Sequence, residues 1–340
     1  MNDQATRRAV MAGLAALPLA GCATAAVRDR DIVQVNLTSA LPPGAMTAAE
    51  GDAAVRTSFD AVSRMTVAVM INGSGPYRFV VDTGANRSVL STEVAAALGL
   101  PVTGRAMVHG IAGVLPSPTI RVQTLTIGGL VTRRVSMPVL DREFLGADGL
   151  LGVDVMPGRR AILDFRGQTF SLFAGEDPRN FAVVPRIGRD AADAITVQAR
   201  HRFGQLTIVD AEIGGVKITA FLDSGAENTV GNPALRDALR GKGALGERLA
   251  QAELVSATGQ LVAGEIATVP PLRLGGVRLG NMTCVFADLH TFRIWDLDAR
   301  PALLIGVDVM RHFDSIELNF RERLVKFRSG QFSRTVNTAG

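Results

Sequence analysis

Residues 79–85 of the chain read FVVDTGA, and residues 220–226 read AFLDSGA. In both places an apolar run of the kind that forms a buried strand ends in Asp-Thr/Ser-Gly-Ala. A second pair of segments recurs in the same order, because residues 149–156 read GLLGVDVM and residues 303–310 read LLIGVDVM. Two matches in the same order indicate that the chain contains two copies of one structural unit.

Two more pairs of segments extend the repeat. Residues 125–129 (LTIGG) correspond to residues 272–276 (LRLGG), and each predicts a strand that runs into a hairpin turn. Residues 162–166 (ILDFR) correspond to residues 317–321 (ELNFR). Alternating apolar residues at 65–71 predict a half-buried strand. Most segments of the chain therefore predict short strands.

Each half also contains one clear helix signal. Ser91 and Asn232, each nine positions after a repeated Asp, are residue types that cap helix N-termini, and Pro233 suits a first helical position. Gly99 and Gly241 are expected to end the two helices. Each half is therefore expected to consist mainly of short antiparallel strands with a single helix.

The composition of the 340 residues is that of a folded globular protein. The chain is 47% hydrophobic, with 36 Lys+Arg against 32 Asp+Glu and with 36 Gly, which excludes a largely disordered chain and disfavours a helical bundle. The net charge of +4 is modest and the arginines are scattered, so nucleic acid is not expected as a partner. Two Cys and four unclustered His provide no pattern for a disulfide framework or a metal site.

The repeated Asp82 and Asp223 are the candidate catalytic residues. A carboxylate at the end of a buried strand is costly without a partner, because desolvation disfavours its ionised form. Two carboxyl groups about 3 Å apart share one proton, so one can act as general base toward water and the other as general acid. This chemistry hydrolyses peptide bonds, and we expect a pH optimum below neutral. One such motif is weak evidence, but two in register are not a coincidence.

The residues after each Asp are assigned a supporting role. Glycine permits a backbone turn that a Cβ would obstruct, and the short hydroxyls can connect the two turns to each other. The residues with this role are Thr83, Gly84, Ser224 and Gly225.

These motifs resemble those of the aspartic protease superfamily, and both halves are closer to the retroviral-type (retropepsin) pattern than to pepsin. Residues 82–90 and 223–230 resemble the family's Asp-Thr-Gly-Ala opening, and residues 150–152 and 304–306 resemble its apolar-apolar-Gly element. The resemblance implies an all-β, bilobal pepsin/retropepsin-like acid protease fold, with two pseudo-symmetric β-barrel lobes that each have one short helix. It also implies a monomer with both aspartates at the lobe interface, a polypeptide substrate, and no metal or organic cofactor.

Two other functions remain open at this stage. The chain could be a non-catalytic peptide-binding lipoprotein built on the same fold, although loss of one Asp would favour this and neither is lost. The unit could also need a partner chain, as retroviral enzymes need a dimer, but the internal duplication argues against this. An active aspartic endopeptidase is the leading hypothesis.

The family closes a β-hairpin flap over the substrate, and the nearest candidate is the glycine-rich stretch at residues 108–113. Its counterpart, residues 256–259 (SATG), is either a second flap or a structural hairpin. Neither contains the flap tyrosine of pepsin-like enzymes. We expect His109 to be a solvent-facing turn residue rather than a substrate contact. The candidate flap residues are His109, Gly110, Ile111 and Gly113.

Three other positions are assigned structural roles. Asp154 and Asp308 recur after the apolar-apolar-Gly elements and could be mistaken for a second carboxylate pair. Because the family uses this position structurally, we expect them to stabilise turns or cap helices. Cys284 is expected to be a buried, unpaired thiol.

The N-terminus resembles an export signal. Arg7 and Arg8 precede an apolar stretch at residues 9–19 that is too short to span a bilayer, and the sequence Leu-Ala-Gly-Cys ends at Cys22. This ending resembles the bacterial lipoprotein signal, which implies lipidation of Cys22. The alternative is an ordinary cleaved signal in which Cys22 is incidental. We therefore expect an exported protein at the periplasmic face of a bacterial membrane, attached only through Cys22, or soluble in the periplasm without that lipid.

The repeat and the signal divide the chain into six parts. The stretch between the two repeats is polar, which favours a linker there. We assign residues 1–21 to a signal peptide, 22–60 to a tether and first strand, 61–175 to an N-terminal retropepsin-like lobe, 176–203 to a linker, 204–330 to a C-terminal retropepsin-like lobe, and 331–340 to a tail.

Overall fold

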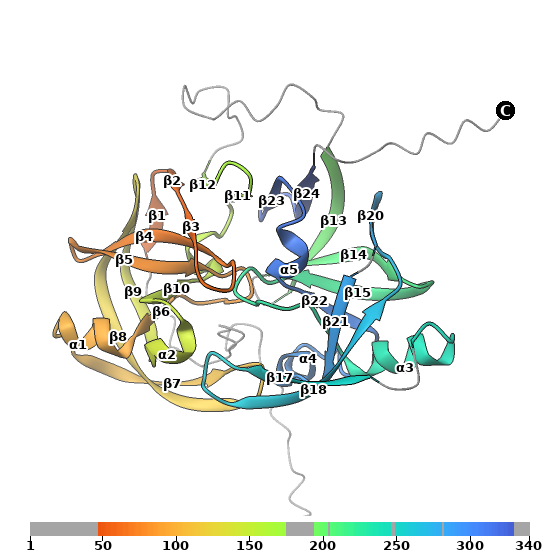
Figure 1. The fold of residues 1–340 in the computed structure, drawn as a ribbon. Coiled ribbons are helices and arrows are strands. Elements are labelled where there is room, and N and C mark those ends of the chain that lie inside the picture. Colours follow the sequence, from red (N-terminus) through yellow and green to blue (C-terminus); the bar gives the residue numbers. More distant parts are fainter. Residues whose placement is uncertain (1–46, 175–193, 203–204, 246–248, 281, 330–340) are drawn as a thin grey trace, which may run out of the picture.

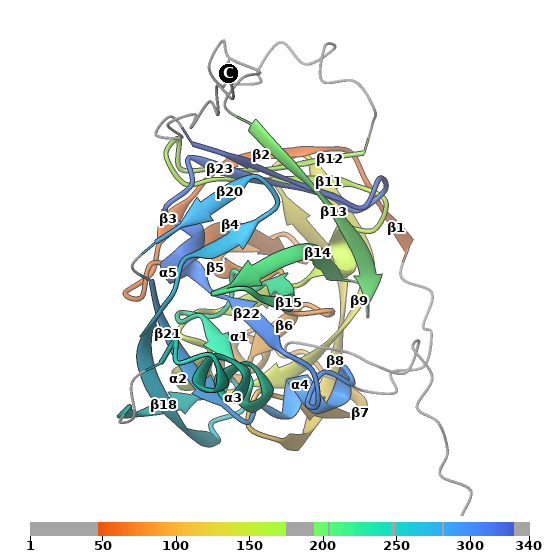
Figure 2. The same cartoon turned by 90° about the vertical axis from the view of Figure 1, so that its right-hand side faces the viewer.

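The computed structural model of the chain describes residues 47–174, 194–202, 205–245, 249–280 and 282–329. Strands dominate these residues and form two lobes, which Figures 1 and 2 show in two views. The all-β bilobal fold expected from the sequence is confirmed. The signal peptide, Cys22 and the C-terminal tail lie outside the described residues.

Six strands of the first lobe close into a barrel. They follow the order β9-β6-β10-β5-β4-β8, and pairing between β8 and β9 closes the ring. The predicted alternation at residues 65–71 is confirmed, because the four apolar positions in β4 are almost fully buried. Two short strands, β1 (Thr47–Glu50) and β3 (Ser58–Phe59), extend this sheet. The barrel strands are β4 (Met65–Ile71), β5 (Ser74–Val81), β6 (Val89–Ser91), β8 (Val114–Ile127), β9 (Leu130–Leu140) and β10 (Gly149–Leu151).

The second lobe repeats this arrangement, with β21-β16-β22-β15-β14 in place of β9-β6-β10-β5-β4. In both lobes a short strand lies parallel to the strand that leads to the repeated Asp, so that Leu151 pairs with Val81 and Ile305 pairs with Leu222. The equivalent of β8 is split into β18 and β19 by two prolines at residues 270–271, which lack the N–H that a strand ladder uses. These strands are β14 (Gln205–Ile213), β15 (Val216–Leu222), β16 (Val230–Gly231), β18 (Leu261–Val269), β19 (Leu272–Leu274), β20 (Val277–Leu279), β21 (Met282–Ala287) and β22 (Ala302–Ile305).

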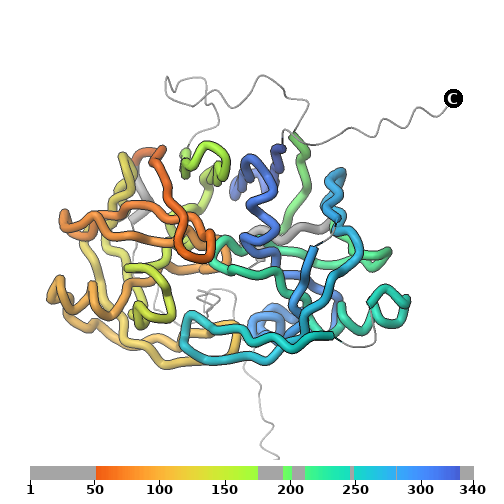
Figure 3. The backbone as a smooth tube through the Cα atoms, in the orientation of Figure 1, coloured from red at the N-terminus to blue at the C-terminus, as the bar shows by residue number. Residues whose placement is uncertain are grey.

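A six-stranded segment of sheet joins the lobes and takes three strands from each half, in the order β13-β24-β23-β11-β12-β2 (top of Figure 1). The repeated segments pair with each other here, since Ile162 of β11 faces Glu317 of β23. The tube in Figure 3 follows the chain through this sheet between the lobes. Its strands are β2 (Ala53–Arg56), β11 (Arg160–Asp164), β12 (Thr169–Phe173), β13 (Ala194–Arg202), β23 (Ser315–Asn319) and β24 (Leu324–Arg328).

The position of β13 differs from the sequence expectation, because this strand lies within residues 176–203, which were assigned to the linker. It pairs with β24 along Ala194 to Gln198. Val197 and Ala199 are buried, with an exposed residue between them, so a period of two was present in the sequence but short. Residues 175–193 lie outside the described residues.

The expected helix is present in each lobe. α1 (Thr92–Ala97) begins after Ser91, whose hydroxyl accepts the N–H of Val94 at 3.2 Å. α3 (Pro233–Gly241) begins after Asn232, whose side chain accepts the N–H of Leu235 at 2.9 Å. The structure adds the short helices α2 (Arg142–Leu145), α4 (His290–Ile294) and α5 (Val307–Met310) and a 3-10 turn at Val153–Val155. Across the described ranges, no helix has the length and apolar character needed to cross a membrane.

Glycines mark the ends of several elements, with one difference from the expectation. Gly99 follows α1 with a φ of +60°, as predicted. α3 ends with Gly241 as its last residue, as predicted. The left-handed residue that follows the helix is not Gly241 but Gly243, with a φ of +65°. Both predicted hairpin turns are present, with left-handed glycines at Gly128 and Gly275.

Candidate active site

Asp82 and Asp223 occupy corresponding places in the two lobes. Asp82 follows β5 and donates its N–H to the carbonyl of Leu151 at 3.0 Å, and Asp223 follows β15 and donates its N–H to the carbonyl of Ile305 at 2.9 Å. Both aspartates are buried, and only 3% and 0% of their surfaces are exposed. The two carboxyl groups lie beside each other, since each packs against the glycine of the opposite turn. The structure thus brings the two repeated aspartates together where the lobes meet.

Thr83 and Ser224 connect the two turns through four hydrogen bonds. The N–H of Ser224 donates to Thr83 Oγ1 at 3.0 Å, and the N–H of Thr83 donates to Ser224 Oγ at 3.1 Å. Each hydroxyl donates to a carbonyl of the opposite lobe, Thr83 to Leu222 at 2.8 Å and Ser224 to Val81 at 2.6 Å. Each of these hydrogen bonds contributes about 1 kcal/mol to stability. Together they fix the position of the two carboxyl groups relative to each other.

Gly84 and Gly225 allow each turn to approach the opposite carboxyl group. A Cβ on Gly84 would overlap the carboxyl group of Asp223, and a Cβ on Gly225 would overlap that of Asp82. Within each turn, the Asp Oδ1 also accepts two backbone N–H groups at 2.9–3.1 Å, from the glycine two positions later and from the alanine after it. The contact between the two turns therefore requires glycine at both positions.

The electrostatics of the pair favour retention of a proton. Burial, followed by the charge of Asp223 and the hydrogen bond to it, raises the pKa of Asp82 well above its ordinary value. The Arg64 guanidinium and the Gly84 N–H act against this rise in the pKa. Because the two groups are strongly coupled, the raised pKa belongs to the pair. A pair that keeps one proton contains a base and an acid side by side.

The pair should make the stability of the fold depend on pH. Above pH 3.8, where an ordinary Asp loses its proton, the raised pKa of Asp82 means that the folded protein binds more protons than the unfolded chain. The free energy of unfolding then falls as the pH rises, until the raised pKa is passed. In the Asp82→Asn variant, residue 82 cannot ionise. We therefore expect the variant to lack this fall in the free energy of unfolding with rising pH. Urea unfolding of both proteins between about pH 4 and about pH 8 measures it.

His109 makes the free energy of unfolding change with pH in the opposite direction, and it does so equally in the wild type and in Asp82→Asn. Its pKa is lowered from 6.5 to about 4, so the unfolded chain binds more protons between these values and stability rises with pH there. The difference between the two unfolding curves therefore isolates the aspartate pair. Parallel curves for wild type and Asp82→Asn would contradict the raised pKa.

Asp154 and Asp308 stabilise the loops that follow the two turns. The Ser88 hydroxyl donates to Asp154 Oδ1 at 2.7 Å, and the Thr229 hydroxyl donates to Asp308 Oδ1 at 2.7 Å. The same two hydroxyl oxygens accept the N–H of the glycine in each apolar-apolar-Gly element at 3.1 Å. These aspartates therefore have the turn-stabilising role expected from the sequence. Cys284 is buried as predicted, and burial raises the pKa of its thiol to about 12.

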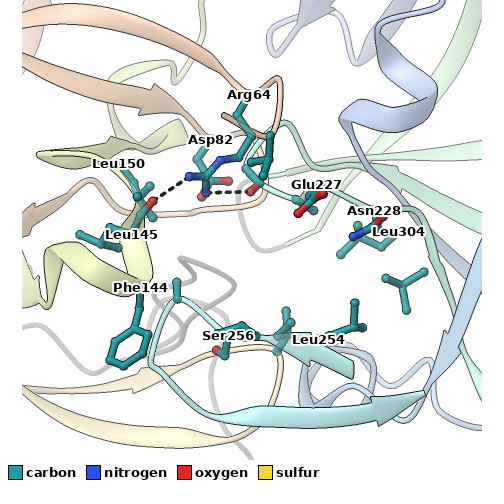
Figure 4. A pocket seen from close by; sticks show the side chains of 18 of the residues that line it. Arg64, Asp82, Phe144, Leu145, Leu150, Glu227, Asn228, Leu254, Ser256 and Leu304 are labelled. Atoms are coloured by element: carbon teal, nitrogen blue, oxygen red, sulfur yellow. Dashed lines mark hydrogen bonds between the residues drawn. The ribbon is translucent and has the colours of Figure 1, made fainter. Parts of the chain in front are cut away.

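A cleft of about 450 Å³ opens beside the aspartate pair and is lined by both lobes (Figure 4). Asp82 and Gly225 form part of its wall. Its other ionisable lining residues are Arg64, Glu143, Glu227 and Glu253. Its larger apolar lining residues are Ile111, Phe144, Leu145, Leu150, Leu254, Leu289 and Leu304.

Two hairpins lie at the end of the molecule opposite the sheet that joins the lobes (Figures 1 and 2), and residues of both line the cleft. The first is β7 (Val102–His109) with β8, and the second is β17 (Ala250–Val255) with β18. Their turns touch, since a Cβ on Gly110 would overlap the Ser256 hydroxyl and a Cβ on Gly113 would lie 3.2 Å from Gln260 Oε1. Ile111 of the first hairpin and residues 253–257 of the second line the cleft. Both hairpins therefore lie beside the cleft, and each contributes residues to its wall.

His109 is held across the lobe interface. Its Nδ1 lies 2.9 Å from Nε2 of His290, the first residue of α4, and the two rings are stacked. The N–H of His290 also donates to the carbonyl of Ile111 at 2.7 Å. Burial, with the charge of His290, lowers the pKa of His109 to about 4. The expectation of a solvent-facing turn residue is wrong, because this contact forms only when the two lobes pack together.

Replacing His109 by Ala should loosen the first hairpin. The variant loses one of the two bonds that attach the hairpin to α4, and a typical hydrogen bond contributes about 1 kcal/mol. We therefore expect amide hydrogen exchange at residues 110–113 to become about fivefold faster. The matched control is His312→Ala, since His312 is exposed and distant in sequence from both hairpins. Exchange rates in His109→Ala equal to those of the control would count against this contact as a restraint.

Two residues that make contacts between the lobes, one of them beside the pair, were missed by the sequence analysis. Arg64 and His290 lie outside the repeated segments, and neither belongs to a recognisable motif. Their positions become meaningful only through contacts with the opposite lobe. Within the described part of the chain, no group of three or more His, Cys, Asp or Glu side chains could hold a metal ion.

Two lobes that meet at a pair of buried aspartates, beside a cleft lined by both lobes, define the bilobal, pepsin/retropepsin-like class of fold. The sequence model of a family described as "Aspartyl protease" matches residues 67–155 and, separately, residues 209–309. These matches cover more than half of the chain, which therefore belongs to the aspartyl protease family, as a tandem of two family units. No significant match was found among curated proteins.

Proposed function

We propose that the chain is an aspartic endopeptidase in which Asp82 and Asp223 activate a water molecule for peptide hydrolysis. The observation that carries this proposal is the buried pair of adjacent carboxyl groups beside a cleft of about 450 Å³. The ionised carboxyl group takes a proton from the water as it attacks the peptide carbonyl carbon. The protonated carboxyl group donates to the carbonyl oxygen, and a proton then passes to the leaving nitrogen.

The shape of the site supports a polypeptide substrate. The cleft lies between the two lobes and beside two hairpins, and its wall contains both apolar and ionisable side chains. Both carboxyl groups come from one chain, which supports activity as a monomer. An active species that elutes only at the dimer position in size-exclusion chromatography would count against the monomer.

Cleavage of a mixed peptide library by the purified protein tests the proposal. We expect hydrolysis at acidic pH that is blocked by a statine-type inhibitor, whose secondary hydroxyl takes the place of the attacking water between the carboxyl groups. Binding of the inhibitor without any hydrolysis would support the alternative of a peptide-binding protein. Hydrolysis that the inhibitor leaves unchanged would place the activity elsewhere.

We also propose that the protein is exported and lipid-anchored at Cys22 on the periplasmic face of a bacterial membrane. The support is the sequence Leu-Ala-Gly-Cys after a short apolar stretch. Metabolic labelling with a radioactive fatty acid tests it, because a Cys22→Ser variant should lose the label. Equal labelling of the two proteins would refute lipid attachment at this residue.

A further inference from the structure

Arg64 is fixed by partners from three parts of the fold. It precedes β4, and its side chain is only 14% exposed. Nε donates to Asp60 Oδ2 at 2.7 Å, Nη2 donates to the carbonyl of Leu145 at 2.8 Å, and Nη1 makes a longer contact with the carbonyl of Gly225 at 3.4 Å. The guanidinium group therefore has a single defined position, with Nη1 and Nη2 directed away from Asp60.

This position places a positive charge beside the carboxyl pair. Gly225 is the residue whose Cα packs against the Asp82 carboxyl group, and Arg64 reaches the carbonyl of that same glycine. Figure 4 shows Arg64 next to Asp82 at the wall of the cleft. In this low-polarity setting, a cation near a carboxyl pair favours its ionised forms. The cation also ties the second lobe's turn to α2 of the first lobe.

The repeat has an uncharged residue at the position of the second half that corresponds to Arg64. Arg64 lies eighteen positions before Asp82, and the residue eighteen positions before Asp223 is Gln205. Gln205 is uncharged, so the two halves differ at this position although their catalytic turns match. Arg64 is therefore a feature of one lobe that acts on a site built by both.

We propose that Arg64 is a positioning residue that stabilises the singly ionised form of the Asp82–Asp223 pair and thereby sets the pH range over which the site works. The link to a working range rests on the proposed function, whereas the effect on ionisation does not. Without Arg64, both deprotonation steps of the pair occur at higher pH. The whole bell-shaped activity profile then moves toward higher pH, by about one unit.

Three variants test the proposal. Arg64→Met removes the charge and should shift both limbs of the kcat/KM profile upward by about one pH unit. Arg64→Lys keeps the charge but cannot contact both carbonyl groups in the same way, so we expect a smaller shift. The matched control is Arg78→Met, which removes an exposed arginine that donates to Gly146, next to α2, at 3.2 Å and should leave the profile in place.

A readout without turnover separates this proposal from the proposed function. The carboxyl ¹³C shifts of labelled aspartates, assigned with Asp82→Asn and Asp223→Asn, report the titration of the pair directly. If wild type hydrolyses no peptide but the titration still moves upward in Arg64→Met, the inference about Arg64 holds and the endopeptidase proposal fails. If hydrolysis occurs and neither titration nor profile moves, Arg64 has only a structural role and the inference is overturned.

Asp60→Asn provides a second variant in case Arg64→Met does not fold. The Asn side-chain oxygen can still accept the N–H groups of Val62 and Arg64 that Asp60 Oδ1 accepts at 3.1 and 2.8 Å. The Asn amide nitrogen cannot accept the Nε–H that Asp60 Oδ2 accepts, but Nη1 and Nη2 keep their carbonyl acceptors. Loss of the Asp60 charge leaves Arg64 less neutralised, so the titration of the pair should move in the opposite direction, toward lower pH. An upward shift or no shift in Asp60→Asn would overturn the proposal.

Discussion

Replacing Asp223 by Asn should lower kcat for peptide hydrolysis by about a thousandfold, and replacing Asp82 by Asn should do the same. An amide cannot take a proton from water and cannot share one with the remaining carboxyl group. The substitution keeps the shape, and the side-chain oxygen can still accept the two N–H bonds of the turn. The expected loss is therefore a loss of chemistry rather than of fold.

The double variant sharpens this expectation. Because the two carboxyl groups act as one unit, Asp82→Asn combined with Asp223→Asn should be no slower than either single variant. The matched control is Asp237→Asn on α3, whose side chain is 63% exposed and whose activity should equal that of wild type. Single-turnover hydrolysis of one library-derived peptide is measured for the wild type and the four variants. Full activity in either single variant would falsify the proposed mechanism.

Replacing Gly225 by Ala should damage both activity and stability. The added methyl group would overlap the Asp82 carboxyl group, which is buried and already held by two backbone N–H groups. Relief requires the two turns to separate, against the four bonds of Thr83 and Ser224. We expect a loss of about 1–3 kcal/mol in the free energy of unfolding and a loss of about a hundredfold in kcat.

Gly84→Ala is the symmetric test, because its methyl group would overlap the Asp223 carboxyl group. The control is Gly241→Ala in the last turn of α3, where an added Cβ has no neighbour within 4 Å and Ala favours the helix. Urea unfolding and peptide hydrolysis are measured on the same samples. Gly225→Ala that behaves like Gly241→Ala would mean that the turns do not need their close contact.

The sequence predicted the features that depend on local pattern and on the repeat. Alternating apolar residues located β4, capping residues located α1 and α3, and the repeated Asp-Thr/Ser-Gly segments located the two turns that the structure brings together. Each of these signals lies within a few neighbouring residues. A pattern of this kind predicts structure well because it depends on sterics and burial within a short stretch of chain.

The features that the sequence could not predict depend on contacts between lobes. The bond between His109 and His290 joins residues from different halves, and so does the contact from Arg64 to Gly225. No periodic pattern in the sequence identifies these partners, because they come together only when the two folded lobes pack against each other.

The strand pairing that joins the lobes constrains how the chain acquires its structure. β11 lies near the middle of the chain, at residues 160–164, yet one of its neighbours, β23, comes from residues 315–319. A growing polypeptide therefore presents the open edge of β11 to its surroundings until nearly all of the chain has been synthesised. Pairing between strands so far apart in sequence slows folding. Neither half can complete its part of the joining sheet until the other half has been synthesised.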